Sequence, residues 1–170
     1  MRLATRKVAI SGLLGAITVV LGATPLGFIP VPTPAGHATI MHIPVIIGGI
    51  LEGPIVGLLA GLIFGMYSLM MATAFFSDPI VAILPRLLIG IIAYLVYRPF
   101  KNNPVLGGAL AAAAGTATNT IGVLSLAVLR GYLPSWKVAS VVVITHGLPE
   151  MVLAILIVSF VIKALAKYIK

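Results

Sequence analysis

The sequence predicts an all-α membrane protein, a six-transmembrane-helix bundle with both termini cytoplasmic. Three observations support this prediction: 61% of the 170 residues are hydrophobic, only 8% are charged, and long apolar runs recur along the chain. Ordinary soluble domains contain roughly 25% charged residues, so this chain has too few polar side chains to cover a water-exposed surface. The sequence contains no cysteine, which excludes disulfides and thiolate metal sites.

We expect one integral membrane domain over residues 1–170, with crossings at 8–28, 38–51, 55–74, 80–97, 105–129 and 138–165. The first run follows basic residues, as in a signal peptide, but its length and the prolines after it predict a retained helix. The second run is short for a crossing, so we expect it to be tilted or joined to a packed loop. The prolines of residues 28–36 (FIPVPTPAG) predict extended, non-helical chain.

The distribution of basic residues predicts the orientation in the cell membrane. With six crossings, both termini and the loop at residues 98–104 share one side, which holds eight of the eleven Lys and Arg residues. The positive-inside rule places that side in the cytoplasm. The net charge of +8 could instead indicate nucleic-acid binding, but these charges are scattered between apolar runs rather than gathered on a solvated face. We therefore expect a lipid bilayer, and no nucleic acid, as the partner of this surface.

Small residues recur at four-residue spacing in several expected helices, where they allow helix backbones to approach closely. Two such rows are predicted to pack helices inside the bundle: Gly57, Gly61 and Gly65, and Gly107, Ala111 and Gly115. A third row, around Gly12 and Ala16 on the first helix, could instead dock a partner helix.

Ionisable side chains are costly inside a membrane, so each one needs a reason. Arg86, His42, His146 and Glu150 fall within the expected crossings, with Asn119 as an uncharged companion. At about 1.5 Å per residue, Arg86, Asn119 and Glu150 are expected ~9, ~15 and ~18 Å below the outer surface. His146 and Glu150 are four residues apart and therefore share a helix face. The convergence of four helices predicts a polar pocket that opens to the outside.

Two interpretations of these polar residues stay open. In the first, Arg86 and Glu150 form a buried ion pair that only holds the bundle together. In the second, the polar residues bind a ligand, with Tyr67 beside them and with His37 and Thr39 covering the ligand from the proline-rich loop. Five polar groups exceed what one structural pair needs, which favours the second interpretation.

No enzymatic or metal motif is present in the sequence. It lacks a G-x-x-x-x-G-K-[ST] phosphate loop, H-E-x-x-H and G-x-S-x-G. His37 and His42 are five residues apart, which is a poor metal spacing, so we expect no metal and no cofactor. The chain is therefore not expected to be an enzyme. A ligand pocket in a chain without a phosphate loop is typical of a receptor subunit that depends on a separate subunit to supply the energy for transport.

With these features in place, the chain resembles the substrate-binding S components of energy-coupling factor (ECF) vitamin transporters. The resemblance spans most of the chain, in size, helix number and the proline-rich outer loop between Phe28 and Gly65. The closest stretches are HIPVIIGGILEGP, PRLLIGIIAYLVYR, TATNT and HGLPE.

The resemblance implies a high-affinity vitamin receptor that works with a transmembrane coupling subunit and two cytosolic ATPase subunits. Members of that family use small residues of the first helix, in an A-x-x-x-A pattern, to meet the coupling subunit. The nearest equivalent here is Gly12 and Ala16, with Ala9 one turn earlier. The family also implies that the outer loop, from Pro30 to His37, gates the pocket.

The polar residues predict the class of ligand. A guanidinium at the depth of Arg86 favours a carboxylate or a phosphate, whereas Asn119, His146 and Glu150 suit hydroxyl or amide groups. Few aromatic residues are expected around the pocket: Tyr67, with Tyr132 and Trp136 near its mouth. A large flat ring system would benefit from stacking partners.

A small anionic vitamin is therefore expected, and the stretch ATIMHIPVIIGG resembles pantothenate-type S components. Two other functions stay open. One is a stand-alone secondary transporter or channel in which Glu150 and His146 exchange protons. The other is a purely structural membrane subunit.

Overall fold

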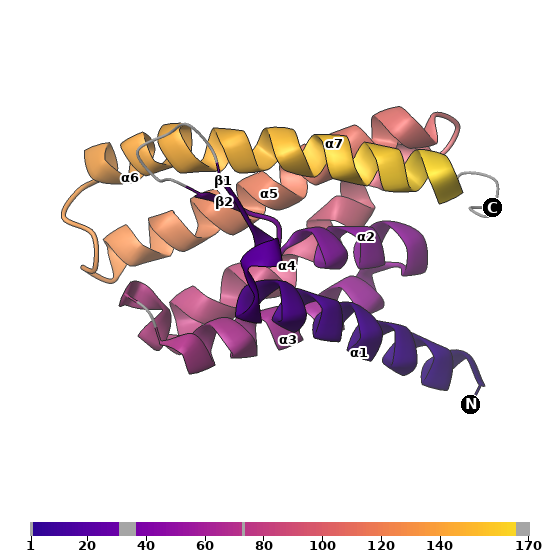
Figure 1. Ribbon diagram of the computed structural model, residues 1–170, viewed down its shortest axis with the longest axis horizontal. Coiled ribbons are helices and arrows are strands. Elements are labelled where there is room, and N and C mark those ends of the chain that lie inside the picture. The colour runs from indigo at the N-terminus through magenta and orange to yellow at the C-terminus, as the bar shows by residue number, and fades with distance from the viewer. Residues whose placement is uncertain (1, 31–36, 73, 166–170) are drawn as a thin grey trace.

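The computed structural model describes residues 2–30, 37–72 and 74–165. In these residues the chain forms seven α-helices, with one small hairpin lying across them (Figure 1). The helices are α1 (Arg2–Ala23), α2 (Ile43–Glu52), α3 (Pro54–Met71), α4 (Pro79–Tyr97), α5 (Pro104–Leu129), α6 (Trp136–Val142) and α7 (Leu148–Leu165). The strands are β1 (Phe28–Pro30) and β2 (His37–Thr39). Short 3-10 turns cover Pro25–Gly27, Ala74–Ser77 and Arg98–Phe100, and a π-helical turn covers Val143–Gly147.

Among the described residues, five helices are long and apolar enough to cross a membrane. They are α1, α3, α4 with its following 3-10 turn, α5, and the continuous helix of α6, the π turn and α7. The remaining expected crossing, the second at residues 38–51, corresponds to α2, which has ten residues where a spanning helix needs about 20. The structure therefore confirms a mostly helical, multi-pass membrane protein, and the count of six crossings stays a prediction.

Two expected helix boundaries differ most from the structure, one because of a proline and the other because of a strand. α1 ends at Ala23 rather than near residue 28, because Pro25 begins a separate 3-10 turn. The second helix begins at Ile43 rather than near residue 38, because the preceding chain pairs as a strand. The structure therefore bears out a mostly helical fold, to which the hairpin adds a short strand pair that the sequence did not predict. The expectation of extended chain at residues 28–36 is confirmed for Phe28–Pro30, and residues 31–36 lie outside the described part.

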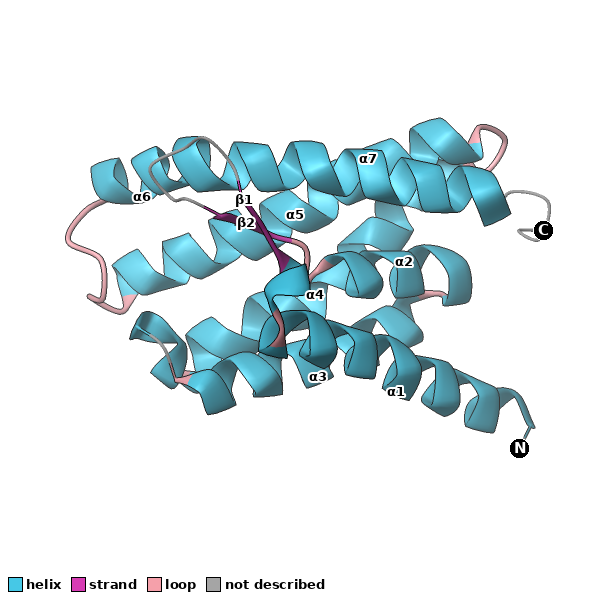
Figure 2. Cartoon of the chain, viewed as in Figure 1, coloured by secondary structure: helices cyan, strands magenta, loops and turns pink. Residues whose placement is uncertain are grey.

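The hairpin crosses over the helices and is the only strand pair in the described chain (Figure 2). β1 and β2 run antiparallel, with Phe28 opposite Thr39 and Pro30 opposite His37. A backbone hydrogen bond from Ile40 to Gly27 (3.0 Å) closes the pair at its base. This pairing satisfies backbone groups that would otherwise be unpaired in an apolar environment.

α3 and α4 pack closely because glycines line their contact. A methyl group at Gly57 would lie 2.7 Å from the Cα atom of Gly90, and one at Gly61 would lie 2.1 Å from the carbonyl oxygen of Arg86. Side chains at these positions would push the helices apart, so Gly57, Gly61 and Gly65 pack helices as the sequence predicted. The close approach to the Arg86 backbone fixes where the start of that side chain lies.

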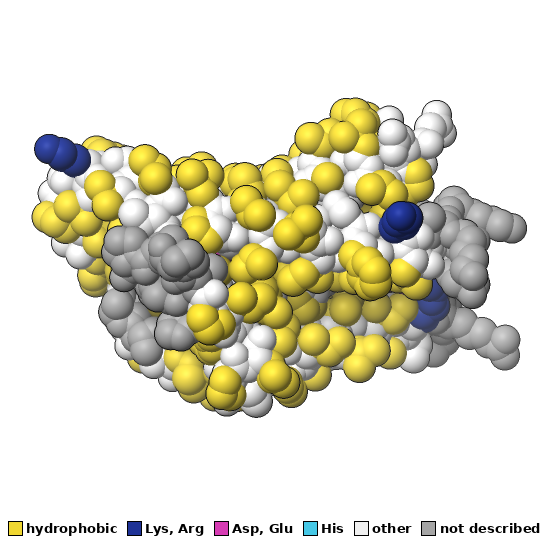
Figure 3. Space-filling view, turned by 45° about the horizontal axis from the view of Figure 1, so that its top comes forward, with side chains coloured by type: hydrophobic (Ala, Val, Ile, Leu, Met, Phe, Trp, Pro, Cys, Tyr) yellow, Lys and Arg dark blue, Asp and Glu magenta, His cyan; other side chains and the backbone are white. Residues whose placement is uncertain are grey.

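The start of α1 and the end of α7 lie at the same end of the bundle (Figure 1). Hydrophobic side chains cover most of the face in Figure 3, with Lys and Arg only towards its two ends. This distribution is typical of a surface that faces lipid. The hairpin, by contrast, lies beside the deep polar residues that the sequence singled out.

Candidate functional site

A cavity of about 740 Å³ opens among the hairpin, α3, α4, α5 and the α6–α7 helix. This volume falls within the usual range for small-molecule sites. Polar side chains that line it come from five elements: Thr39, Ser68, Arg86, Asn119, Thr120, Thr145, His146 and Glu150. The cavity thus brings together most of the residues that the sequence singled out, and Tyr67 also lines it.

Among the described residues that line the cavity, Arg86 is the only basic one apart from His146, and it is only 3% exposed. Its Nη1 donates to the Val81 carbonyl at 2.9 Å. Its Cζ lies 5.2 Å from the ring centroid of Phe64 and 4.5 Å from that of Phe76. Among the described residues, Nε has no hydrogen-bond partner and no carboxylate lies within ion-pair distance. Aromatic rings and one carbonyl therefore hold a buried cation whose charge is left unpaired.

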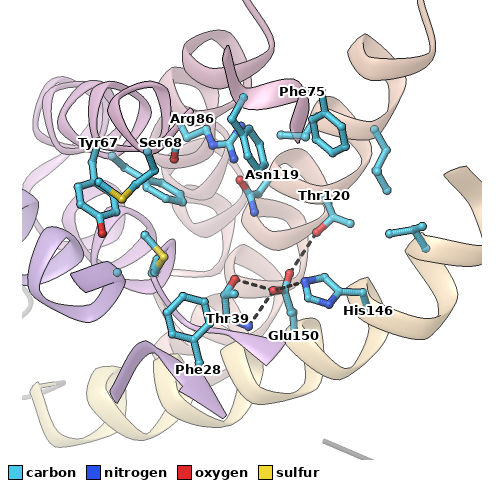
Figure 4. Close-up of a pocket in the computed structure, with 18 of the residues that line it drawn as sticks. Phe28, Thr39, Tyr67, Ser68, Phe75, Arg86, Asn119, Thr120, His146 and Glu150 are labelled. Carbon is cyan, nitrogen blue, oxygen red and sulfur yellow. Dashed lines mark hydrogen bonds and ion pairs between the residues drawn. The ribbon is translucent and has the colours of Figure 1, made fainter. Parts of the chain in front are cut away.

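Asn119 lies beside Arg86 in the cavity (Figure 4). It is 9% exposed, and its Oδ1 has no hydrogen-bond partner in the part of the chain that the structure describes. A buried amide oxygen without a partner costs free energy, so such groups usually meet a ligand or water. Arg86 and Asn119 together form a polar wall with unused hydrogen-bonding capacity.

Glu150 forms a second polar wall, facing the first across the cavity (Figure 4). Its carboxylate accepts hydrogen bonds from the Thr39 backbone amide (2.8 Å) and hydroxyl (2.6 Å), and a longer one from Thr120 (3.5 Å). Both hydrogen bonds from Thr39 go to Oε1 of Glu150, and His146 Nε2 lies 2.9 Å from that same atom. The structure therefore pairs Glu150 with His146 and not with Arg86, contrary to the brace interpretation.

The π turn determines where His146 lies. Residues Val143–Gly147 widen the helix between α6 and α7 just before Glu150. Such turns occur often at functional sites because they redirect side chains locally. Gly147 allows α5 to come close here, because a methyl group at this position would lie 2.9 Å from the Thr120 side chain.

Of the two remaining predicted histidines, His42 does not line the cavity. His42 is fully buried, its Nε2 lies 2.9 Å from the Thr116 hydroxyl, and its Nδ1 has no partner among the described residues. His42 therefore packs inside the bundle rather than beside a ligand. The His37 backbone belongs to β2, but its side chain lies outside the described part, as does the predicted gate between residues 31 and 36.

The expectation of few aromatic residues is wrong. Five aromatic side chains line the cavity, namely Phe28, Phe64, Tyr67, Phe75 and Phe76. Tyr132 and Trp136 are absent from the described lining: Tyr132 donates to Asp78, and Trp136 is 56% exposed. The Phe75–Phe76 pair next to the Asp78 turn could have been noticed in the sequence. Phe64 carried no signal, because a phenylalanine inside an apolar helix is more often core than lining.

The small residues of the first helix lie on its outer face. Ala9, Gly12 and Ala16 are all exposed. A methyl group added at Gly12 would meet nothing within 4 Å. Ala9, Gly12 and Ala16 thus form an exposed strip of small side chains on α1 that no described part of the chain covers.

Comparison with known proteins identifies the family of this chain. Residues 6–162 match the family described as ECF transporter, substrate-specific component. The chain is also 34% identical, over 152 residues, to the pantothenic acid transporter PanT of Lactococcus lactis subsp. cremoris strain MG1363. That alignment covers 76% of this chain and 78% of the relative. The family match spans nearly the whole chain, and this protein therefore belongs to the family of ECF transporter substrate-specific components.

Proposed function

We propose that this chain is the high-affinity pantothenate-binding subunit of an ATP-driven vitamin importer. The observation that supports it most strongly is the unpaired guanidinium of Arg86 in the cavity. A buried cation without a carboxylate partner is costly. A ligand carboxylate would remove that cost, because a guanidinium binds it through two parallel hydrogen bonds.

The opposite wall suits the other end of pantothenate. This vitamin has a carboxylate at one end and hydroxyl groups beside an amide at the other. Glu150 and His146 of this wall can exchange hydrogen bonds with the hydroxyls, and Oδ1 of Asn119, on the wall of Arg86, can accept one from the amide. The name of the Lactococcus relative also supports pantothenate.

The aromatic lining makes a second ligand class worth testing. Five aromatic residues could stack on a flat ring system such as a flavin or a folate. Two of these rings, Phe64 and Phe76, lie over Arg86 instead. We therefore keep pantothenate as the proposed ligand and use riboflavin and folate as competitors in the test.

Calorimetric titration of the purified chain in detergent tests this proposal. We expect pantothenate to bind, and riboflavin and folate not to displace it. Arg86→Ala and Asn119→Ala should each weaken binding by ~10-fold or more, because each removes a hydrogen-bonding group facing the carboxylate or amide. Circular dichroism should show that both variants keep their helical content. A folded wild-type chain that binds no pantothenate would overturn the proposal, and native mass spectrometry would then identify any copurifying ligand.

Membership of the family implies an ECF module as partner. We propose that this module comprises a transmembrane coupling subunit and two cytosolic ATPase subunits, and that Ala9, Gly12 and Ala16 dock the coupling subunit. The exposed, unfilled surface at Gly12 supports this assignment. Gly12→Trp should prevent copurification with the module while leaving pantothenate binding unchanged. Copurification at wild-type level would move the docking surface elsewhere.

We also propose six crossings, with both termini in the cytoplasm of the cell and the cavity open to the outside. The basic residues near the start of α1, after α4 and near the end of α7 support this orientation. Labelling of single cysteines introduced near each terminus and in the loop before α6, in intact cells, tests it directly. The chain has no natural cysteine, so no background label is expected.

A stand-alone proton-coupled transporter is the second candidate, because His146 and Glu150 form a close pair in the cavity. Uptake of pantothenate by the chain alone in proteoliposomes, driven by a proton gradient, would favour this candidate. Uptake that requires the module and ATP would favour the importer.

A further inference from the structure

Asp78 lies outside the cavity lining, yet it is only 4% exposed at the N-terminus of α4. Its Oδ1 accepts the backbone amide of Ile80 at 2.9 Å, as a helix cap. Its Oδ2 accepts Arg130 Nε at 2.7 Å and the Tyr132 hydroxyl at 3.3 Å. Arg130 and Tyr132 directly follow α5. These three residues, Asp78, Arg130 and Tyr132, fasten the start of α4 to the end of α5, and we name them the Asp78 clasp.

The clasp also holds the short 3-10 turn before it, Ala74–Ser77. The backbone amide of Asp78 donates to the Phe75 carbonyl at 3.3 Å. At the other side of this turn, Ala72 caps α3 in the left-handed region, with φ at 48°, and donates to the Ser68 and Leu69 carbonyls. The turn that contains Phe75 and Phe76 is therefore anchored on both sides.

Phe76 connects the clasp to the cavity. Its ring centroid lies 4.5 Å from Cζ of Arg86, close enough for a cation–π interaction. Val81, whose carbonyl accepts from Nη1 of Arg86, lies only three residues after Asp78 in the first turns of α4. Two contacts that orient the guanidinium thus come from segments on either side of Asp78.

We propose that Asp78 is a positioning residue that determines selectivity for a carboxylate. The clasp holds Phe76 over Arg86, and this contact restricts the guanidinium to one orientation. A planar carboxylate depends on that orientation, because both of its oxygens must meet parallel N–H groups. A neutral group at the same place depends on it far less. This inference rests on the proposed function, in which Arg86 binds the carboxylate of pantothenate.

Asp78→Asn is the variant that tests the clasp most directly. The amide oxygen can still cap α4 at Ile80, but the amide nitrogen then faces the Nε donor of Arg130, so the clasp is lost while the cap is kept. The two probes are pantothenate and panthenol, its neutral analogue with an alcohol in place of the carboxylate. We expect the ratio of the dissociation constant of panthenol to that of pantothenate to fall by ~10-fold in the variant, because pantothenate loses affinity and panthenol does not.

Four further variants separate a positioning role from a general loss of stability. Phe76→Leu should lower the same ratio, and the double variant with Asp78→Asn should lower it no further than the stronger single change. Glu52→Gln removes the charge that pairs with Arg6, at the opposite end of the bundle from the clasp. This variant should leave the ratio unchanged. Tyr132→Phe removes one donor to Asp78 and replaces Asp78→Asn as the test if that variant does not fold.

The outcomes distinguish this proposal from the proposed function. A folded Asp78→Asn variant that discriminates pantothenate from panthenol as well as the wild type overturns the positioning role alone. An equal loss of affinity for both probes also overturns it, because Asp78 would then act only on the fold. A wild-type chain that binds neither probe overturns the proposed function, and the positioning role with it.

Discussion

Thr39 donates both its backbone amide and its hydroxyl to one oxygen of Glu150, although the two residues are 111 positions apart in the sequence. This double hydrogen bond fastens strand β2 of the hairpin to the first turn of α7. Both residues line the cavity, so the bond also closes one part of its wall. Glu150 therefore holds the hairpin in addition to any contact that it makes with a ligand.

Loss of this contact should let a ligand leave faster. In Thr39→Val, Glu150 loses the hydroxyl donor, and a hydrogen bond to a charged group contributes about 1.5–3 kcal/mol. We expect pantothenate to dissociate at least ~10-fold faster, which stopped-flow chase experiments would measure. Thr118→Val is the matched control, because that hydroxyl donates to Ala114 within α5 and does not line the cavity. An unchanged dissociation rate in Thr39→Val would show that the hairpin is held by other contacts.

A charge at position 86 should not be sufficient for tight binding. Arg86→Lys keeps a positive charge but loses the planar fork and the stacking of the guanidinium on Phe64 and Phe76. We expect pantothenate to bind ~10-fold or more weakly to this variant. Affinity for panthenol should stay near the wild-type value. Full retention of pantothenate affinity in the lysine variant would mean that charge alone is recognised.

Substitution by alanine should destabilise the protein far more at the glycines of the α3–α4 contact than at Gly12 in the exposed strip on α1. Gly57→Ala places a methyl group 2.7 Å from Gly90, so the helices must separate, and overpacking typically costs about 1–3 kcal/mol. Gly12→Ala meets no atom within 4 Å and gains helix propensity, so it should leave stability unchanged or slightly raised. Thermal unfolding of the two variants in the same detergent measures the difference. Equal stability would contradict the close packing of α3 on α4.

The Asp78 clasp should add stability only while the carboxylate is charged. Burial pushes the pKa of Asp78 upward, but the hydrogen bonds from Arg130, Ile80 and Tyr132 outweigh it and hold the pKa below its ordinary value of 3.8. Because the pKa is depressed in the folded state, the stabilisation is complete above the ordinary value and is lost as the pH falls through the lower folded value.

Wild type should therefore unfold at a higher temperature than Asp78→Asn at neutral pH, and this difference should shrink in acid below about pH 4. Unfolding curves recorded over a pH series test this expectation. A difference that stays constant into strong acid would assign the effect to hydrogen bonding of the side chain rather than to its charge.

Much of the fold could be predicted because its determinants are local. A run of apolar residues must form a helix in lipid, since its backbone groups have no other partners there, and prolines mark where such helices start. The bounds of α3, α4 and α5 accordingly lie within three residues of those expected. The hairpin was missed because strand pairing between Phe28 and Thr39 depends on a contact across a loop, which a residue pattern does not record.

The sequence by itself determined that this is a membrane protein with costly polar groups buried in its helices, because composition alone decides how a chain partitions between water and lipid. It also identified Arg86, Asn119, His146 and Glu150 as polar residues whose presence inside a membrane needs an explanation. Only the tertiary structure decided how they pair. It joins Glu150 to Thr39 and His146, leaves Arg86 among aromatic rings and removes His42 from the cavity. Hydrogen bonds of a few ångströms between residues far apart in sequence depend on the packing of whole helices, and no local pattern encodes that packing.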